Sequence, residues 1–173
     1  GAVAKGFATE RVAQQLEASD MPSFIISAGG NVRAGAAPAD GRAAWGIGIQ
    51  RPEGAVLSAS EDDLVEIVYL SDMSVVTSGD YQRYYTVDGV RYHHLIDPTT
   101  LMPATHYRSV SILTHDSGMA DLLSTAAFLL PYEESRALVE SLEGVEAIWV
   151  MPDESVRMTD GAAAVAASQG AGQ

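Results

Sequence analysis

Histidine, carboxylate and hydroxyl side chains gather in one short stretch of the sequence, Tyr-His-His-Leu-Ile-Asp-Pro-Thr-Thr at residues 92–100. A histidine whose pKa lies near neutrality suits general-base chemistry, in which the imidazole takes a proton from a hydroxyl group. Successive side chains of a strand point to opposite faces, so only one of His93 and His94 can face a given pocket. The same residues also fit a surface strand that enters a turn capped by Asp97. The residue types alone leave both interpretations open.

A carboxylate and a hydroxyl four residues apart form a second candidate group. Asp121 and Thr125 lie in the run GMADLLSTAAFLL, whose composition predicts a helix that places both oxygens on one face. Such a pair, completed by water and substrate phosphates, is a common way to hold Mg²⁺. An acidic residue in the first turn of a helix is also ordinary, because it interacts favourably with the helix dipole. The pair therefore indicates either a metal site or a helix-stabilising feature.

Two glycine-containing segments follow expected strands. Gly29 and Gly30, in ISAGGNVRAG, permit a close backbone approach to a ligand, but they match neither G-x-G-x-x-G nor a P-loop. Thr77, Ser78 and Gly79, in VVTSGDYQRYY, offer hydroxyl groups followed by tyrosines. Each segment fits a ligand site, and each also fits an ordinary turn or packed strand end.

Charge and composition exclude several classes of protein. The formal net charge of −13, without a cluster of lysine or arginine, argues against a nucleic-acid partner because phosphate backbones repel such a surface. The absence of cysteine excludes disulfides and cysteine-based metal sites. The longest apolar runs fall far short of the roughly 20 residues that a membrane-spanning helix needs. A length of 173 residues suits one domain with a substantial core.

The periodicity predicts an α+β fold with a largely antiparallel sheet and packed helices. Helices are expected at residues 5–18, with Ala8, Val12 and Leu16 on the apolar stripe, and at 119–130 and 133–142. The pair Asp88-Gly89 predicts a tight hairpin turn. An Ala/Gly-rich tail is expected from Gly161. Further strands are expected at residues 23–27, 44–50, 55–60, 64–70, 73–78, 109–114, 145–151 and 155–159.

The order of these segments along the chain resembles the ApbE family, the FAD:protein FMN transferases. The resemblance covers about residues 1–130 and continues through AIWVM. It implies an ApbE-like (T-fold-like) α+β core and a Mg²⁺-dependent reaction that passes FMN from FAD to a Ser or Thr hydroxyl of a target redox protein and releases AMP. The segments that carry it are GAVAKGFATERV, SAGGNVRA, WGIGIQRP, VVTSGDYQRYYTVDGVRYHHLIDPTTLMPA and SVSILTHDSGMADLLSTAAFLL.

The resemblance also implies roles for individual residues. His94 would be the base that takes the acceptor's proton, with His93 as the alternative, and Asp97 would orient the loop or bind nearby. The implied metal ligands are Asp121, Thr125 and the main-chain carbonyl of Ala2. The implied flavin-binding positions are Lys5, Gly6, Gly29, Gly30, Asn31, Thr77, Ser78 and Gly79. Two departures from the family pattern are Leu95, where isoleucine is usual, and Leu101-Met102, where glycine is usual.

Family members carry a further segment ahead of the part that matches this sequence. The sequence is therefore interpreted as a C-terminal portion, with residues 1–160 forming an ApbE-like flavin transferase domain and 161–173 the tail. The resemblance implies a place in the bacterial cell envelope, with any lipoprotein anchor lying in the missing N-terminal part. Two alternatives are an FAD pyrophosphatase that yields FMN and AMP, and a flavin-binding domain that no longer catalyses.

Overall fold

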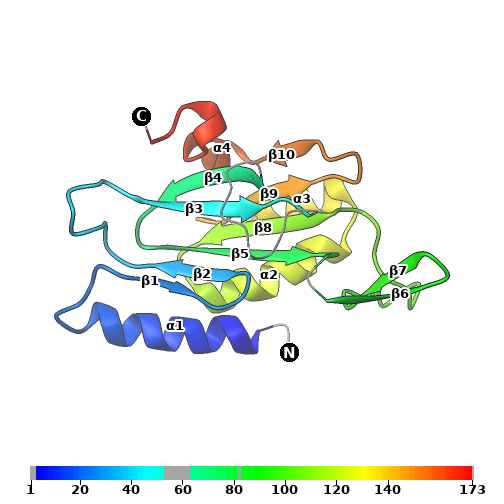
Figure 1. Cartoon of the computed structure of the whole chain (residues 1–173), viewed down its shortest axis with the longest axis horizontal. Coiled ribbons are helices and arrows are strands. Elements are labelled where there is room, and N and C mark those ends of the chain that lie inside the picture. The colour runs from blue at the N-terminus through cyan, green and yellow to red at the C-terminus, as the bar shows by residue number, and fades with distance from the viewer. Residues whose placement is uncertain (1–2, 53–62, 82, 173) are drawn as a thin grey trace.

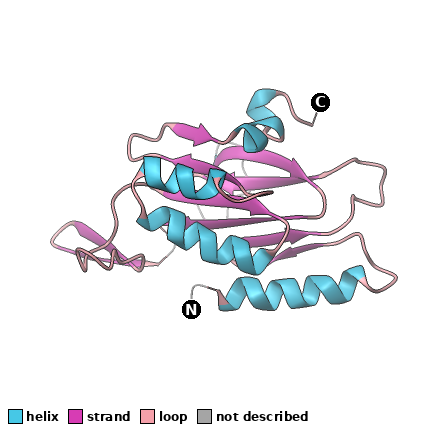
Figure 2. Ribbon diagram, turned by 180° about the vertical axis from the view of Figure 1, so that it is seen from behind, coloured by secondary structure: helices cyan, strands magenta, loops and turns pink. Residues whose placement is uncertain are grey.

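A six-stranded antiparallel sheet forms the centre of the fold, with the longer helices on one face and a small second sheet and the short C-terminal helix on the other (Figures 1 and 2). The structure is a computed structural model that describes residues 3–52, 63–81 and 83–172. The strand order of the large sheet is β1-β2-β5-β8-β9-β10, while β3 pairs with β4 and β6 with β7. The helices are α1 (Ala4–Glu17), α2 (Ser117–Leu129), α3 (Tyr132–Glu140) and α4 (Asp160–Ala164), with a short 3-10 helix, η2 (Ala167–Gln169). The strands are β1 (Ile25–Ser27), β2 (Asn31–Ala34), β3 (Trp45–Gln50), β4 (Leu64–Leu70), β5 (Met73–Gly79), β6 (Tyr84–Val87), β7 (Val90–His93), β8 (Ser109–Thr114), β9 (Glu146–Val150) and β10 (Val156–Met158).

Strand alternation divides the interior into two cores, one on each face of the large sheet. On the helix side, Val110 and Ile112 pack with Phe128 and Trp149, and the Trp149 Nε1–H donates to Ser135 Oγ at 2.9 Å. On the other side, residues such as Val75, Leu113 and Ile148 pack against β3 and β4. Every residue of β8 is buried, because this strand lies between β5 and β9 and is covered on both faces. Within the described residues, no helix combines the length and hydrophobicity needed to cross a membrane.

Helix α1 packs on α2 through small and polar residues. A Cβ atom on Gly6 would lie 2.2 Å from the Ser117 carbonyl oxygen and 2.6 Å from Asp121 Cβ, so only glycine allows the two helices to approach this closely. The buried residues of α1 are Gly6, Thr9, Glu10 and Ala13. The stripe expected from the sequence is different: Val12 is 48% exposed, so the apolar periodicity did not identify the packed face.

Polar pairing explains this unusual helix face. Arg33 of β2 is fully buried, and its guanidinium lies 3.4 Å from Glu10 Oε2 and 3.1 Å from Asp72 Oδ1. Glu10 Oε2 also accepts a hydrogen bond from the Ser117 main-chain N–H at 2.9 Å. Removing Arg33 would leave the buried Glu10 carboxylate without its cation, which costs far more than a surface pair contributes. This network ties α1 to the sheet and to the start of α2.

Helix α2 begins at a side-chain cap. Asp116 Oδ1 accepts a hydrogen bond from the Met119 main-chain N–H at 2.7 Å. We expect Asp116→Ala to lower the free energy of unfolding by about 1 kcal/mol, because an N–H of the first turn loses its acceptor. Chemical denaturation measures the change. Asp116→Asn is the matched control, since its amide oxygen still accepts the bond, and an equal loss in both variants would contradict the capping role.

Most other elements agree with the sequence prediction, including the hairpin of β6 and β7 at Asp88-Gly89. Strand β2 was not expected, because Asn31-Val-Arg-Ala follows two glycines and carries a charge. The tail expected from Gly161 instead contains most of α4 and all of η2, and it is packed, with Ala162 and Ala166 fully buried. Their small side chains let this segment lie against β4 and β9. The strand expected at residues 55–60 lies outside the described residues.

Candidate functional site

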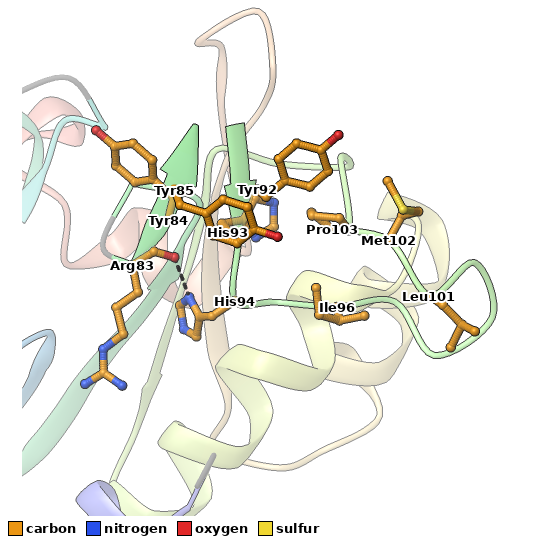
Figure 3. A pocket seen from close by; sticks show the side chains of 10 residues that line it. All are labelled: Arg83, Tyr84, Tyr85, Tyr92, His93, His94, Ile96, Leu101, Met102 and Pro103. Carbon is orange, nitrogen blue, oxygen red and sulfur yellow. Dashed lines mark hydrogen bonds between the residues drawn. The ribbon is translucent and has the colours of Figure 1, made fainter. Parts of the chain in front are cut away.

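The two adjacent histidines at the end of β7 point in different directions, as strand alternation predicts (Figure 3). His93 is only 7% exposed and packs edge-on against Phe128, with the ring centroids 5.7 Å apart. Its Nε2 lies 2.9 Å from the Ala104 carbonyl oxygen, and its Nδ1 accepts a hydrogen bond from the Leu95 N–H at 3.3 Å. A carbonyl oxygen can only accept, so Nε2 carries the proton and both ring nitrogens are engaged. His93 is therefore a packed structural residue and not the available base.

His94 is exposed and keeps one ring nitrogen available. Its Nδ1 lies 3.3 Å from the Arg83 carbonyl oxygen, which can only accept, so the proton resides on Nδ1 and the Nε2 lone pair is free (Figure 3). Its main-chain N–H also donates to this carbonyl at 3.1 Å. Partial burial of the ring is the main cause of a His94 pKa below the ordinary 6.5; the charges of Arg83 and Lys5 and the neighbouring His93 act in the same direction, and the hydrogen bond to the Arg83 carbonyl opposes them. The imidazole is therefore neutral, the form that a general base requires.

Asp97 holds the turn that follows the histidines. Its Oδ1 accepts from the Thr99 N–H at 2.8 Å, and its Oδ2 accepts from the Thr100 hydroxyl at 3.1 Å. The Thr99 bond is the main cause of a lowered pKa for this carboxyl group. Leu101 closes the same turn at φ 59°, a left-handed conformation that costs a non-glycine residue about 1–2 kcal/mol. Asp97 thus orients the loop, and its side chain is engaged there.

A cavity of about 500 Å³, here named the hairpin cavity, opens beside His94 (Figure 3). Aromatic and aliphatic side chains make up most of its wall, and the rings of Tyr85 and Tyr92 stack at 5.4 Å. It is lined by Arg83, Tyr84, Tyr85, Tyr92, His93, His94, Ile96, Leu101, Met102 and Pro103. The candidate base therefore lies on the edge of an apolar, solvent-accessible hollow.

A buried carboxylate joins the first turn of α1 to α2. Asp121, 6% exposed, accepts a hydrogen bond from the Gly6 main-chain N–H at 2.8 Å and lies 3.6 Å from the Lys5 ammonium. Lys5 also donates to the Gly29 carbonyl oxygen at 3.2 Å. The structure thus brings together Lys5, Gly6, Gly29 and Asp121, which come from three separate segments of the sequence.

The glycine turn between β1 and β2 supplies the other side of this cluster. Gly29 and Gly30 have φ values of 55° and 81°, which favour glycine. Asn31 is fully buried: its Oδ1 accepts from the Ser117 hydroxyl at 2.8 Å, whereas its Nδ2 has no partner among the described residues. A buried donor without a partner is rare in a folded protein and marks a place where a ligand or water can bind.

A second cavity of about 450 Å³, here named the glycine-turn cavity, lies beside this turn. Three of the flavin-binding positions expected from the sequence, Gly29, Gly30 and Thr77, line it. Its remaining lining residues are Ser27, Val32, Ile47, Gly48, Gln50, Leu64, Val75 and Tyr81. The two cavities therefore separate the expected flavin-binding residues from the candidate base.

The other residues that the resemblance implied as site residues make packing contacts or lie outside the described part of the chain. Ser78 Oγ is 2.9 Å from Ser124 Oγ on α2, and the Thr125 hydroxyl donates to the Asp121 carbonyl oxygen at 3.4 Å. A Cβ on Gly79 would collide with the Tyr81 ring at 2.5 Å. Ala2 lies outside the described residues. Among the residues described, no group of three His, Cys, Asp or Glu side chains could hold a metal ion.

Sequence reasoning missed two residues at the site. Ser124 lies one position from the expected ligand Thr125 and bonds the Asp121 carbonyl oxygen at 3.1 Å. Arg83 orients His94 through its carbonyl oxygen, and nothing in the local sequence signals this contact. A main-chain contact of this kind depends on the hairpin geometry and not on the type of side chain.

Comparison with solved structures gives the same architecture. The ApbE protein of Thermotoga maritima matches with a TM-score of 0.80 and 36% identity, over 92% of this chain and 50% of that one. The flavinyl transferase ApbE of Pseudomonas stutzeri matches with a TM-score of 0.74 and 31% identity, over 95% of this chain and 50% of that one. The α+β fold and its resemblance to ApbE proteins are thereby confirmed.

Sequence comparison agrees with the structural match. A FAD:protein FMN transferase of Treponema pallidum is 44% identical over 93% of this chain and 45% of its own length. A FAD:protein FMN transferase of Klebsiella pneumoniae is 32% identical over 90% of this chain and 46% of its own length. The chain thus spans about half the length of the curated relatives it matches. The family model described as ApbE family matches residues 1–149. The chain belongs to the ApbE family.

Proposed function

We propose that the protein transfers FMN from FAD to a Ser or Thr hydroxyl of a target redox protein and releases AMP. The observation that carries the proposal is the state of His94, an exposed, neutral imidazole with a free Nε2 at the edge of the hairpin cavity. The names of its relatives, FAD:protein FMN transferases, support the same reaction. His94 is in electrostatic range of Lys5, which itself contacts Asp121 and Gly29.

The two cavities suit the two substrates. The glycine-turn cavity includes Gly29, whose carbonyl oxygen accepts a hydrogen bond from the Lys5 ammonium, so positive charge is available at its edge for FAD. The hairpin cavity has His94 at its edge and an apolar wall, which suits a polypeptide segment presenting a hydroxyl group. Lys5 lies between them, because it bonds Gly29 and also acts on His94. We place the pyrophosphate of FAD near Lys5.

The reaction requires little covalent chemistry from the protein, so positioning and charge neutralisation dominate. The acceptor hydroxyl oxygen attacks the phosphorus of the FMN half, and its proton passes to His94 Nε2. The bond between that phosphorus and the bridging oxygen breaks, and AMP leaves with the bond's electron pair. A doubly charged diphosphate and a neutral alcohol thus give a singly charged phosphodiester, doubly charged AMP and one proton, so the charges balance.

Mg²⁺ fits the Asp121 region through the chemistry of its donors. Asp121 and Thr125 offer a carboxylate and a hydroxyl one helical turn apart, and Lys5 already places a cation 3.6 Å from the carboxylate. A site with one carboxylate suits Mg²⁺ that substrate phosphates help to hold. When bound, the ion would neutralise charge on the pyrophosphate and the AMP leaving group. Asp121 would hold it, while Gly6 N–H keeps the carboxylate oriented through its 2.8 Å bond.

A second candidate function is hydrolysis of FAD to FMN and AMP. The exposure of His94 favours it, since water can reach the free Nε2 as readily as a protein hydroxyl can. The third alternative, a flavin-binding domain without catalysis, is less well supported because such a domain does not need an oriented neutral histidine.

One experiment separates the three functions. The natural full-length protein is incubated with FAD, Mg²⁺ and a target domain, and AMP is quantified by chromatography while protein-bound flavin is followed by fluorescence in denaturing gels. Transfer gives AMP and flavin on the target in equal amounts. AMP without labelled target selects the hydrolase, and FAD binding without AMP selects the binding domain.

We also propose, from the family alone, that the protein acts in the bacterial cell envelope as a lipoprotein. Cell fractionation of the natural protein, with metabolic labelling by a fatty acid, tests this. Recovery in the soluble cytoplasmic fraction without label would contradict it.

A further inference from the structure

Arg83 differs from the other basic residues in its surroundings. Within residues 3–52, 63–81 and 83–172, the charged group of Arg83 has no hydrogen bond, ion pair or ring contact, whereas every other lysine and arginine has at least one interaction. Arg91 on the same hairpin, for example, lies 4.4 Å above the Tyr84 ring and 3.9 Å from Asp80. Arg11 and Arg157, which also lack a carboxylate partner among the described residues, still bond Gln14 and lie over the Tyr132 ring respectively.

Two hydrogen bonds fix the position of the Arg83 main chain relative to His94. The Arg83 carbonyl oxygen accepts from the His94 N–H at 3.1 Å and from His94 Nδ1 at 3.3 Å. Figure 3 shows the Arg83 side chain extending past His94, away from the rings of Tyr85 and Tyr92. The free ring nitrogen of His94 faces the same side. The Arg83 guanidinium and the free His94 nitrogen thus lie on the same side of the hairpin.

We propose that the Arg83 guanidinium binds the phosphate of FAD that is transferred, beside the oxygen that His94 deprotonates. This assignment rests on the proposed function and extends it to a further residue. A guanidinium presents paired N–H donors that match phosphate oxygens, and in phosphoryl transfer charge is spread over these oxygens in the transition state. Lys5 alone would meet the pyrophosphate from the Asp121 side. Arg83 supplies the second cation, on the acceptor side.

The same arrangement links Arg83 to the protonation of His94. The groups that bear on His94 are Arg83 before β6, His93 on β7 and Lys5 on α1; the charge of each disfavours the charged imidazolium, whereas the hydrogen bond to the Arg83 carbonyl favours it. Removing the Arg83 charge therefore raises the pKa of His94. Glutamine at position 83 keeps the carbonyl oxygen that orients the ring, so the charge is removed without loss of the His94 hydrogen bonds.

Three variants of the full-length protein test the proposal: Arg83→Gln, Arg83→Lys and the control Arg91→Gln. AMP release from FAD is measured over a range of pH values, with KM and kcat separated. We expect Arg83→Gln to lower kcat by about 10²–10³-fold, comparable with the loss of one oriented donor to a transition-state oxygen. Arg83→Lys should recover part of the rate as a point charge. Arg91→Gln should leave the rate essentially unchanged, because its guanidinium already has partners.

The pH profile separates binding from a structural role. With Arg83→Gln the acid limb of kcat should move to higher pH, and the melting temperature should stay that of the wild type. An unchanged rate overturns the proposal, and so does a loss of rate accompanied by a lower melting temperature and an unmoved acid limb. If the wild type itself releases no AMP, the proposed function fails. If the wild type is active, His94→Gln is inactive and Arg83→Gln keeps the wild-type rate, the proposed function stands and only the proposed role of Arg83 is overturned.

Discussion

Replacing His94 by glutamine is expected to lower the rate of FMN transfer by about 10²–10⁴-fold, the usual contribution of a general base. Glutamine keeps a polar side chain of similar size but offers no basic nitrogen to take the acceptor's proton. FAD binding should persist, because the glycine-turn cavity does not include His94. Single-turnover AMP release, with FAD affinity from flavin fluorescence, measures both quantities.

Two controls sharpen this result. His106→Gln changes a histidine outside the hairpin cavity and should leave transfer intact. His93→Gln should lower the melting temperature, because His93 packs on Phe128 and bonds the Ala104 carbonyl. A catalytic loss in His106→Gln equal to that in His94→Gln, or normal transfer by His94→Gln, would contradict the assignment of the base.

The pH dependence of the wild type follows from the same residue. Burial lowers the pKa of His94 below 6.5, so its neutral form persists to lower pH than in an ordinary histidine. The transfer rate should therefore fall only as the pH decreases through this lowered pKa. A kcat profile with its acid limb above 6.5 would show that the charged imidazolium is favoured and would contradict the environment described for His94.

Asp121→Asn is the second change with a large expected effect, a loss of Mg²⁺ dependence together with at least about 10²-fold in rate. The amide oxygen can still accept the hydrogen bond from the Gly6 N–H, so α1 should keep its place on α2. What is lost is the negative charge 3.6 Å from Lys5, and with it the attraction for a divalent cation.

Titration of AMP release with Mg²⁺ distinguishes this effect from unfolding. The wild-type rate should rise and saturate, whereas the Asp121→Asn rate should stay low at every concentration. Asp116→Asn, on the same helix and capable of capping it, is the control that retains full Mg²⁺ dependence. An unchanged Mg²⁺ response in Asp121→Asn would remove this carboxylate from the metal site.

The sequence predicted strands well where alternation or a turn signal was strong, as at β4, β8 and the Asp88-Gly89 hairpin. It predicted the wrong face of α1, because the packed residues Gly6 and Glu10 are small or charged. The reason is tertiary: Gly6 meets the backbone of α2, and Glu10 meets Arg33. The hydrophobic periodicity of α1 carries no information about these partners, because they lie far away in the sequence.

The site shows the same division. Alternation predicted that the adjacent histidines diverge, but only the contacts of His93 with Phe128 and Ala104 show which one is buried. Family resemblance implied flavin-binding roles for Lys5 and Gly29 and a metal-binding role for Asp121, and in the structure the Lys5 ammonium contacts both Gly29 and Asp121. The orientation of His94 by a main-chain carbonyl could not be read from side-chain types at all.

The hairpin of β6 and β7 pairs with neither of the larger sheets, and the four residues of β6 are exposed (Figure 1). Segments with few buried contacts open at a lower free energy than the interior of a fold. Because the proton-accepting side chain is oriented by a carbonyl at the base of this hairpin, gentle warming should disorder the hairpin first. Thermal inactivation should then precede the cooperative melting seen by far-ultraviolet circular dichroism. The temperature at which activity is lost would then depend on the stability of the β6–β7 hairpin. Stabilising the Asp88-Gly89 turn should raise this temperature without altering the core.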